Sequence, residues 1–239
     1  MEIFNSAGKN LDKSDVLLLT KSIGSLVVSS SVAVDDMEDE QISIEVERLS
    51  GNLEITKGNM SLKDFILLTT FNGDAVTSDD DYETTAECEI CENGAIHLDE
   101  KDVIKIRLTG LTPAATYVLN GIEAPDTSLQ VLSLENKSMA SDEKSKVFDV
   151  YDCDIVLLDS HPSIEEIAYT YINDVVVKYT LHELKVLSRS IDPVGYVRKN
   201  GTVKASFVGK LQLPLFGVKS IEIRKAQGKV INMVVRKES

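Results

Sequence analysis

The sequence predicts an all-β protein made of two tandem small jelly-roll β-barrels (a double jelly roll), each containing a short helix. Short runs rich in Val, Ile and Thr recur between turn signals along all 239 residues. Several runs alternate polar and apolar residues with period two, as in 104–108 and 221–223, which is typical of half-buried strands. A similar order of elements also occurs twice. We therefore expect a first barrel with an N-terminal arm at 1–126 and a second barrel at 127–239.

Strands of the first half are expected wherever such a run lies between turn signals, of which Ser50-Gly51-Asn52 is one. In the first eleven residues Ile3 and Phe4 lie on a polar background, so by default this segment forms a frayed terminus, or an arm that orders against a neighbour. The expected strands occupy 15–23, 25–34, 42–49, 52–56, 84–90, 95–98, 102–111 and 116–124.

Strands of the second half are expected by the same rules, so that each half has about eight strands. The run 146–158 is read as one long strand that corresponds to 25–34. Pro214 lies between leucines, which predicts an edge or bent strand there, or equally a contact between subunits. The expected strands occupy 128–134, 146–158, 167–172, 174–179, 196–203, 204–215, 218–226 and 229–237.

The two helices are expected at SLKDFILL (61–68) and TLHELKVL (180–187). Ser61 and Thr180 are good N-cap residues, and an acid follows each three positions later, Asp64 and Glu183. Each helix follows a strand–turn–strand segment, and an earlier strand, VLLLT or LQVLSL, opens each unit. This repeated order favours a tandem duplication with a boundary near Pro125. The alternative is two similar edges of one large sandwich.

Composition indicates an ordinary globular protein, with 43% hydrophobic and 27% charged residues. Trp is absent, so the core must rest on Val, Ile and Leu. We expect neither a membrane span nor a signal peptide. The three cysteines, Cys88, Cys91 and Cys153, are too few and too unevenly spaced for a disulfide framework, which suits a reducing cytosol.

Charge is distributed unevenly along the chain, whose formal net charge is −14. Residues 1–126 carry nine Lys and Arg against 25 Asp and Glu, whereas residues 127–239 carry 16 against 14. From Lys178 onward there are 13 basic and four acidic side chains. An acidic chain argues against specific nucleic-acid binding, because phosphates attract basic surfaces. The two halves are therefore expected to face different surroundings.

Two stretches, ISIEVERLSGNLEITKGNMSLKDFI (42–66) and IAYTYINDVVVKYTLHELKVL (167–187), carry a resemblance to a known family. With the element order, they resemble the double jelly-roll major capsid proteins of tailless icosahedral bacteriophages with an internal membrane, the corticovirus-like group. The resemblance implies a structural subunit of the virion rather than an enzyme. Three copies would form a pseudo-hexagonal homotrimer, and many such capsomers would tile the shell.

The same resemblance implies the partners. They are neighbouring capsomers, minor capsid and vertex proteins, and the internal lipid membrane, with the protein made in the host cytoplasm. The barrels would stand upright on the shell. The basic C-terminal region would be favoured near anionic lipid head groups by about 1 kcal/mol for each Lys or Arg close to the surface.

Two acidic runs, DDMEDE (35–40) and DDDYE (79–83), are the candidates for a metal site. Calcium binds several oxygen ligands, so Asp35, Asp36, Asp79, Asp80 and Asp81 are its candidate ligands. Neither run has the spaced pattern with a fixed glycine that marks a calcium loop, so solvated loop charge is the preferred interpretation. No cofactor is expected.

CEIC at 88–91 could hold zinc or exchange thiols, but a structural zinc site needs four ligands. On a strand, residues three apart point to opposite faces, so we expect inert thiols. Glycine-rich nucleotide loops and a GxSxG motif are absent from the sequence, and its histidines, His97, His161 and His182, lie apart. We therefore expect no catalytic residues.

One alternative function is a β-sandwich binding module or a minor vertex or spike protein of such a virion. Carbohydrate-binding modules usually use Trp and Tyr to stack on sugars, and the lack of Trp counts against that function. An enzyme on a double barrel would repeat its histidine ligands in both halves, and these histidines do not repeat.

Overall fold

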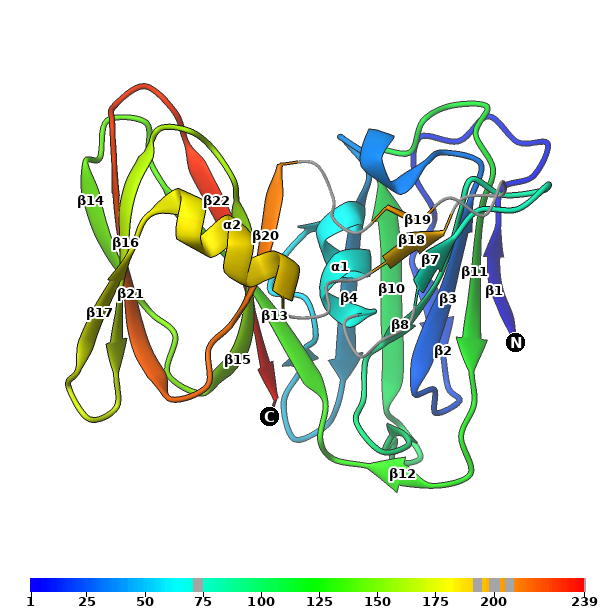
Figure 1. The fold of residues 1–239 in the computed structure, drawn as a ribbon. Coiled ribbons are helices and arrows are strands. Elements are labelled where there is room, and N and C mark those ends of the chain that lie inside the picture. The colour runs from blue at the N-terminus through cyan, green and yellow to red at the C-terminus, as the bar shows by residue number, and fades with distance from the viewer. Residues whose placement is uncertain (71–74, 191–194, 198–202, 205–208, 239) are drawn as a thin grey trace. The chain divides into compact units, whose positions relative to one another are not determined.

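The structure, a computed structural model, describes residues 1–70, 75–190, 195–197, 203–204 and 209–238 (Figure 1). Strands dominate this part of the chain, with helices α1 (Leu62–Thr69) and α2 (Leu181–Ser190) and one short 3₁₀ turn (Val34–Asp36). The predicted all-β class is confirmed. No helix in the described ranges is long and apolar enough to cross a membrane.

The chain divides into two compact units, residues 1–134 with 194–205, and residues 135–193 with 206–238. In unit 1 one sheet has the order β1-β11-β3-β8-β7-β18-β19, the second has the order β2-β10-β4-β5, with β6 also on β4, and β9 pairs with β12. The strands of unit 1 are β1 (Glu2–Asn5), β2 (Leu17–Leu19), β3 (Ser25–Ser30), β4 (Gln41–Glu47), β5 (Leu53–Glu54), β6 (Met60–Ser61), β7 (Ala75–Thr77), β8 (Thr84–Glu89), β9 (Ala95–Ile96), β10 (Val103–Thr109), β11 (Tyr117–Ile122), β12 (Thr127–Ser128), β18 (Gly195–Val197) and β19 (Val203–Lys204).

In unit 2 one sheet has the order β13-β22-β15-β20 and the other has the order β14-β21-β16-β17. The first residues of β13 belong to the end of unit 1. The strands are β13 (Leu132–Met139), β14 (Ser145–Asp149), β15 (Cys153–Asp159), β16 (Ile164–Tyr171), β17 (Val176–Tyr179), β20 (Lys210–Pro214), β21 (Val218–Lys225) and β22 (Ile231–Glu238).

Both units have the same strand order. The first strand (β1 or β13) pairs with the last (β11 or β22), which pairs with the third (β3 or β15), which is followed by β8 or β20. In the other sheet the strand order is β2-β10-β4-β5 in unit 1 and β14-β21-β16-β17 in unit 2. Two four-stranded sheets connected in this way form a jelly roll. The predicted double jelly roll is confirmed.

The N-terminal residues form strand β1, where the sequence predicted a frayed arm. Phe4 pairs with Leu119 of β11, and the terminal ammonium donates to the Gly121 carbonyl at 2.9 Å. The first strand of unit 1 is therefore β1, and β2 corresponds to β14, so the expected match of VLLLT to LQVLSL is wrong. A strand of four residues with no fully buried side chain leaves little apolar pattern in a sequence.

Three other expectations differ from the structure. The run 146–158 is two strands, β14 and β15, which belong to different sheets and are separated by a turn where Asp152 has a φ of +64°. The first unit also extends past the boundary expected at Asp126, because the Leu134 N–H donates to the Ile55 carbonyl at 2.7 Å. In addition, β18 pairs in parallel with β7, so part of the expected strand 196–203 belongs to unit 1.

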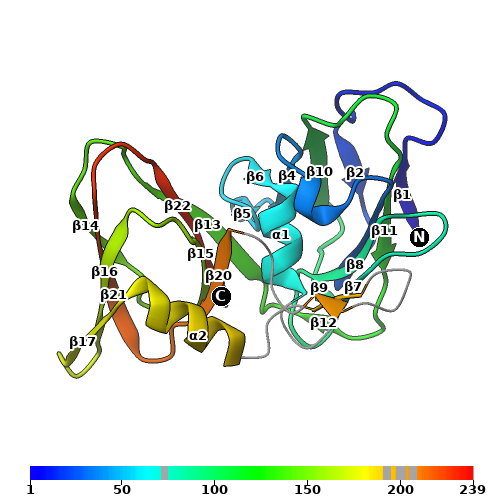
Figure 2. The same ribbon diagram turned by 45° about the horizontal axis from the view of Figure 1, so that its top comes forward.

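Both helices begin at the predicted caps. The Ser61 hydroxyl accepts the Asp64 N–H at 3.4 Å. Thr180 and Glu183 form a full capping box, with the Thr180 N–H donating to Glu183 Oε2 at 2.7 Å and the Glu183 N–H donating to Thr180 Oγ1 at 3.3 Å. Figure 2 shows α1 beside β4 and β6 and α2 beside β20, in agreement with their contacts.

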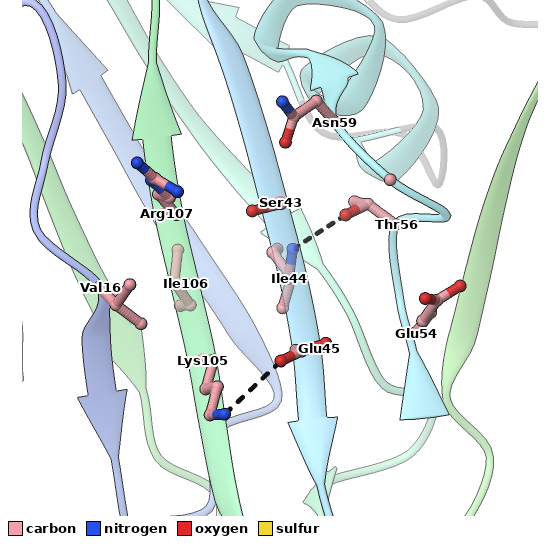
Figure 3. Close-up of a pocket in the computed structure, with 11 residues that line it drawn as sticks. Val16, Ser43, Ile44, Glu45, Glu54, Thr56, Asn59, Lys105, Ile106 and Arg107 are labelled. Atoms are coloured by element: carbon pink, nitrogen blue, oxygen red, sulfur yellow. Dashed lines mark hydrogen bonds and ion pairs between the residues drawn. The ribbon is translucent and has the colours of Figure 1, made fainter. Parts of the chain in front are cut away.

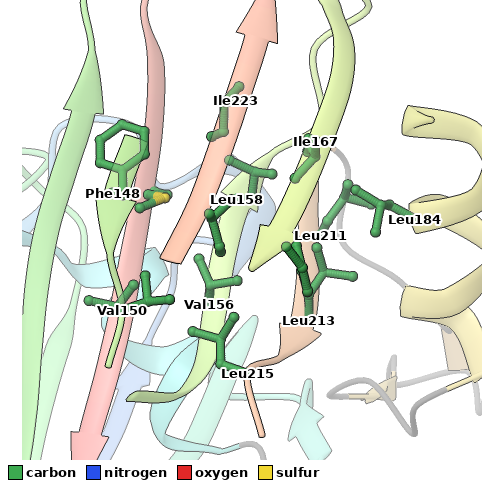
Figure 4. Packing of buried hydrophobic residues seen from close by; sticks show 14 of the residues in the cluster. Phe148, Val150, Val156, Leu158, Ile167, Leu184, Leu211, Leu213, Leu215 and Ile223 are labelled. Carbon is green, nitrogen blue, oxygen red and sulfur yellow. The ribbon is translucent and has the colours of Figure 1, made fainter. Parts of the chain in front are cut away.

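The cores are aliphatic, as the lack of Trp required. In unit 2 alternate residues of both sheets point inward and meet Leu184 of α2, which is fully buried (Figure 4). β20 is an edge strand, and Pro214 lies on it, as predicted. The labelled members of this core are Phe148, Val150, Val156, Leu158, Ile167, Leu184, Leu211, Leu213, Leu215 and Ile223.

Candidate functional site: the two ends of each barrel

Each barrel has two ends at which connections between strands gather, and the register of the sheets assigns each connection to an end. In unit 1, Ser30 at the end of β3 pairs with both Thr84 and Tyr117, which begin β8 and β11. Connections 31–40, 78–83 and 110–116 therefore lie at one end, which we call the acidic end. Glu47 pairs with Val103, so connections 20–24, 48–52 and 90–102 lie at the other end.

The acidic end brings together the two acidic runs that the sequence singled out. The Thr84 hydroxyl donates to the Val32 carbonyl at 2.8 Å and joins the two connections. Asp36 and Asp79–Asp81 are exposed there, and half-buried Asp35 lies 3.7 Å from Lys63 Nζ. Asp79 accepts the N–H groups of Asp81 and Tyr82 at 2.9 and 2.8 Å, which fixes its own turn. The result is a strongly negative end.

Within the residues that the structure describes, His, Cys, Asp and Glu side chains form no group of three or more suited to a metal ion. Because Asp79 accepts bonds from its own turn and Asp35 lies near Lys63, neither carboxylate is arranged around a shared centre. Calcium binding by Asp35, Asp36, Asp79, Asp80 and Asp81 stays a prediction.

Glu40, the last residue of the first acidic run, is buried, which the sequence did not indicate. Its Oε1 accepts hydrogen bonds from the Tyr117 hydroxyl at 2.6 Å and the Thr112 hydroxyl at 2.8 Å. Burial acts most strongly and would raise the pKa of Glu40. The bonds from Tyr117, Thr112 and the backbone outweigh it, so the pKa lies below its usual value of 4.5.

Gly110 fixes the same end by allowing a close backbone contact. Its φ is +66°, and a Cβ at this position would lie 2.1 Å from the Asp39 carbonyl oxygen. Only glycine tolerates both conditions, so this residue lets connection 110–116 pack on connection 31–40. Together with Glu40, it makes the acidic end an ordered surface.

In unit 2 the end that corresponds to connections 20–24, 48–52 and 90–102 of unit 1 is formed by turns 150–152, 172–175 and 215–217. In both units we call this end the apolar end. Phe216 is 78% exposed, Ile172 63%, Tyr151 59% and Val175 50%. Backbone bonds join the turns, from the Ile172 N–H to the Gly217 carbonyl at 2.8 Å and from the Val150 N–H to the Lys219 carbonyl at 3.1 Å. Hydrogen-bonded turns thus leave large apolar side chains exposed to solvent.

The apolar end of unit 1 repeats this feature more weakly. Leu49, in the turn between β4 and β5, is 86% exposed. Leu129, which follows β12, is 72% exposed, and β12 pairs with β9 in connection 90–102. Sequence reasoning did not mark these leucines, because single apolar residues in turns carry no periodic signal.

Charged groups at the apolar end are largely paired. In unit 2, Lys219 binds Asp174, and Lys237 lies 3.4 Å from Asp152. Arg236 binds Asp154 in a buried pair. In unit 1, Lys21 lies 3.2 Å from Glu123. Three of the described basic residues after Lys178, Lys219, Arg236 and Lys237, are therefore each paired with an aspartate.

A groove of about 350 Å³ lies on the outer face of the β2-β10-β4-β5 sheet (Figure 3). Within it, Lys105 Nζ lies 3.8 Å from Glu45, and the Ile44 N–H donates to Thr56 Oγ1 at 2.8 Å. Lys105 Nζ also lies 2.7 Å from Glu47, which is not part of the groove lining. The bond to Glu47 raises the pKa of Lys105. A second groove, of about 450 Å³, lies between β1 and β2.

The cysteines and histidines have local partners. Cys88 is fully buried, and burial raises the pKa of its thiol to about 12. Burial also raises the pKa of Cys91, whose sulfur lies 3.2 Å from the Gln130 carbonyl. His97 contacts Thr127 and His161 contacts Ser163, at 3.2 and 2.8 Å. Cys88 and Cys91 are thus buried thiols, and His97 and His161 each contact a neighbouring hydroxyl group.

Comparison with known proteins gives a likeness of fold. No family profile matches the sequence, and no curated protein does either. The crystal structure of the major capsid protein P2 from bacteriophage PM2 matches with a TM-score of 0.55 and 8% identity, over 98% of this chain and 94% of that one. The mavirus major capsid protein matches with a TM-score of 0.37 and 9% identity, over 100% and 86%.

At 8% identity the likeness to P2 concerns the fold alone, and nothing further is based on the weaker match to the mavirus protein. The likeness spans nearly all of both chains, so it includes both units. The chain therefore has the fold of a double jelly-roll major capsid protein.

Proposed function

We propose that the chain is a structural subunit of an icosahedral virion shell, a major capsid protein of the corticovirus-like group that forms pseudo-hexagonal homotrimers over an internal membrane. The observation that carries this proposal is the duplication. Two jelly rolls with the same strand order are joined in one chain, and the fold resembles that of the PM2 major capsid protein.

A duplicated barrel is useful for tiling a surface. Three chains with two like barrels present six similar sides, so identical rings can pack with few different kinds of contact. In the groove of Figure 3, Lys105 is paired with Glu45, and the histidines do not repeat between the halves as the ligands of a double-barrel enzyme would. The proposal therefore includes no enzymatic activity.

The uneven charge supports contacts between unlike units of neighbouring copies. Unit 1 (residues 1–134 with 194–205) carries 12 Lys and Arg against 25 Asp and Glu, whereas unit 2 (residues 135–193 with 206–238) carries 13 against 14. Two first units in contact would repel each other, whereas a first unit would be repelled far less by the nearly neutral second unit. A head-to-tail ring satisfies this condition at each contact.

The further partners in this proposal are neighbouring capsomers, minor capsid and vertex proteins, and the internal membrane. The protein would be made in the host cytoplasm and located in the virion. Specific nucleic-acid binding is not part of the proposal, because the formal net charge is −14.

The solution mass of the purified protein tests the proposal. Light scattering with calcium and with a chelator is expected to give three times the chain mass of 26.3 kDa. Loss of the trimer on chelation would assign calcium to the acidic end. A strict monomer at high concentration in both conditions would contradict the proposal and favour a binding module.

A further inference from the structure

We propose that the apolar end of each unit inserts its exposed side chains into the head-group layer of a lipid bilayer. The inference deepens the proposed shell function and rests on it. It assigns the membrane-facing surface to turns 150–152, 172–175 and 215–217 of unit 2, and to Leu49 and Leu129 of unit 1.

The first argument for this inference is that the apolar side chains of these turns are exposed on an ordered backbone. Phe216, Ile172 and Tyr151 are each more than half exposed, although large apolar side chains are costly in water. Backbone bonds between the turns fix the positions from which these side chains project. A rigid apolar surface of this kind is typical of an interaction site.

The second argument is that both units expose an apolar residue in the same turn. Leu49 lies in the turn between β4 and β5, and Ile172 lies in the corresponding turn between β16 and β17. Each is among the most exposed apolar residues of its unit, at 86% and 63%. The same position in both barrels thus favours one common partner for that end.

Shape and charge favour a lipid surface as that partner. The side chains project from turns, whereas both described grooves lie on unit 1, along strands β1, β2, β4 and β10. Tyr151 and Phe216 are ring side chains of the kind that lie at membrane interfaces. Asp152 and Asp174 are paired with Lys237 and Lys219, which lowers the repulsion between these two carboxylates and phosphate groups.

The acidic end of unit 1 excludes the opposite orientation. Asp36, Glu38, Asp39 and Asp79–Asp81 are exposed at that end. Phosphate head groups would repel these carboxylates, most strongly in a bilayer that contains anionic lipid. We therefore assign the bilayer to the end of this unit where Leu49 and Leu129 are exposed.

Flotation of the full-length protein with phosphatidylcholine vesicles, and with equimolar phosphatidylcholine–phosphatidylglycerol vesicles, tests the inference. The double variant Phe216→Ser with Ile172→Ser is expected to lower the ratio of bound to free protein by about tenfold or more. Binding of the unsubstituted protein to phosphatidylcholine is expected to persist at high salt, because burial of apolar surface is not screened.

Matched controls separate insertion from general surface hydrophobicity. Val147→Ser removes a side chain with the same 63% exposure as Ile172, but in the middle of strand β14. Val230→Ser removes an exposed valine from the turn between β21 and β22, at the opposite end of unit 2. Both variants are expected to bind vesicles like the unsubstituted protein.

A fluorescent probe gives a positive readout that does not depend on loss of binding. The chain contains no Trp, so Phe216→Trp introduces a single fluorophore. Its emission is expected to shift to the blue with vesicles, whereas that of Val230→Trp is expected to stay unchanged. An unshifted Phe216→Trp spectrum, or equal flotation of the double variant, would overturn the inference.

The same samples sized by light scattering keep the two proposals distinguishable. A trimer that fails to bind either kind of vesicle overturns the lipid inference and leaves the shell function standing. A strict monomer overturns the shell function. A double variant that loses its trimer, with no shift in the Phe216→Trp spectrum, would identify the turns as a contact between subunits and would also overturn the lipid inference.

Discussion

The Glu40 carboxylate accepts a hydrogen bond of 2.6 Å from the Tyr117 hydroxyl inside the acidic end of unit 1. Glu40 is 3% exposed and Tyr117 is 2% exposed. The bond joins the connection before β4 to the start of β11, so it links the two sheets of the barrel. A single buried pair thus orders the end that carries the two acidic runs.

Tyr117→Phe is expected to destabilise unit 1 by about 1–3 kcal/mol, because it leaves a buried carboxylate without its strongest donor. Chemical denaturation measures the loss. Tyr151→Phe is the matched control, since Tyr151 is 59% exposed, and it is expected to leave the free energy of unfolding unchanged. Equal effects of the two variants would contradict the structural role of the bond.

Glu40 also makes stability depend on pH. Its pKa in the folded protein lies below the usual 4.5, so its contribution is present above 4.5 and is lost as pH falls through the lowered pKa. Melting temperatures across this range are expected to fall more steeply for the unsubstituted protein than for Glu40→Gln. Parallel curves for the two proteins would show that Glu40 does not carry the effect.

Thr180→Ala is expected to destabilise α2 by about 1 kcal/mol, because it removes the side-chain acceptor of the capping box. Thermal melting followed by circular dichroism measures this change. Thr20→Ala serves as the control, since Thr20 is exposed in the turn before β3. If Thr20→Ala had the same effect, the capping box would not be the cause.

Leu184→Ala is expected to cost about 2–5 kcal/mol, because Leu184 is fully buried where α2 meets the core of unit 2. Val186→Ala, on the same helix, is expected to cost far less, since Val186 is 54% exposed. Denaturation of the two variants side by side gives the comparison. A similar loss for both would mean that α2 does not pack as the structure describes.

Cysteine reactivity tests the interpretation of CEIC. Burial raises the pKa of the Cys88 thiol to about 12, so Cys88 is expected to resist alkylation until the protein unfolds. Cys153 is only half-buried and is expected to react first, although burial raises its pKa as well. Mass spectrometry after timed alkylation gives the order. Rapid modification of Cys88 in the native protein would reopen a redox role.

Local signals predicted the helices and most strands. The bonds of Ser61 with Asp64 and of Thr180 with Glu183 join residues three positions apart, so their pattern is visible in the sequence. Alternation at Ile104 and Ile106 likewise predicted β10, because its side chains face a core on one side only.

Elements without a local pattern were missed or misread. Strand β1 is held by pairing with β11, more than a hundred residues away, and the unit boundary depends on Leu134 binding Ile55. The two strands within 146–158 looked continuous, because both are apolar and only the turn at Asp152 separates them. Such features depend on partners that lie far away in the sequence.

The sequence by itself determined the fold class, the duplication, both helix caps and the presence of two acidic runs, because each follows from residue types at short spacings. Only the tertiary structure decided that those runs share one end of unit 1, that Glu40 is buried, and that Phe216, Ile172 and Tyr151 share one end of unit 2. Pairing between distant strands makes these choices, and its register depends on how the whole barrel closes.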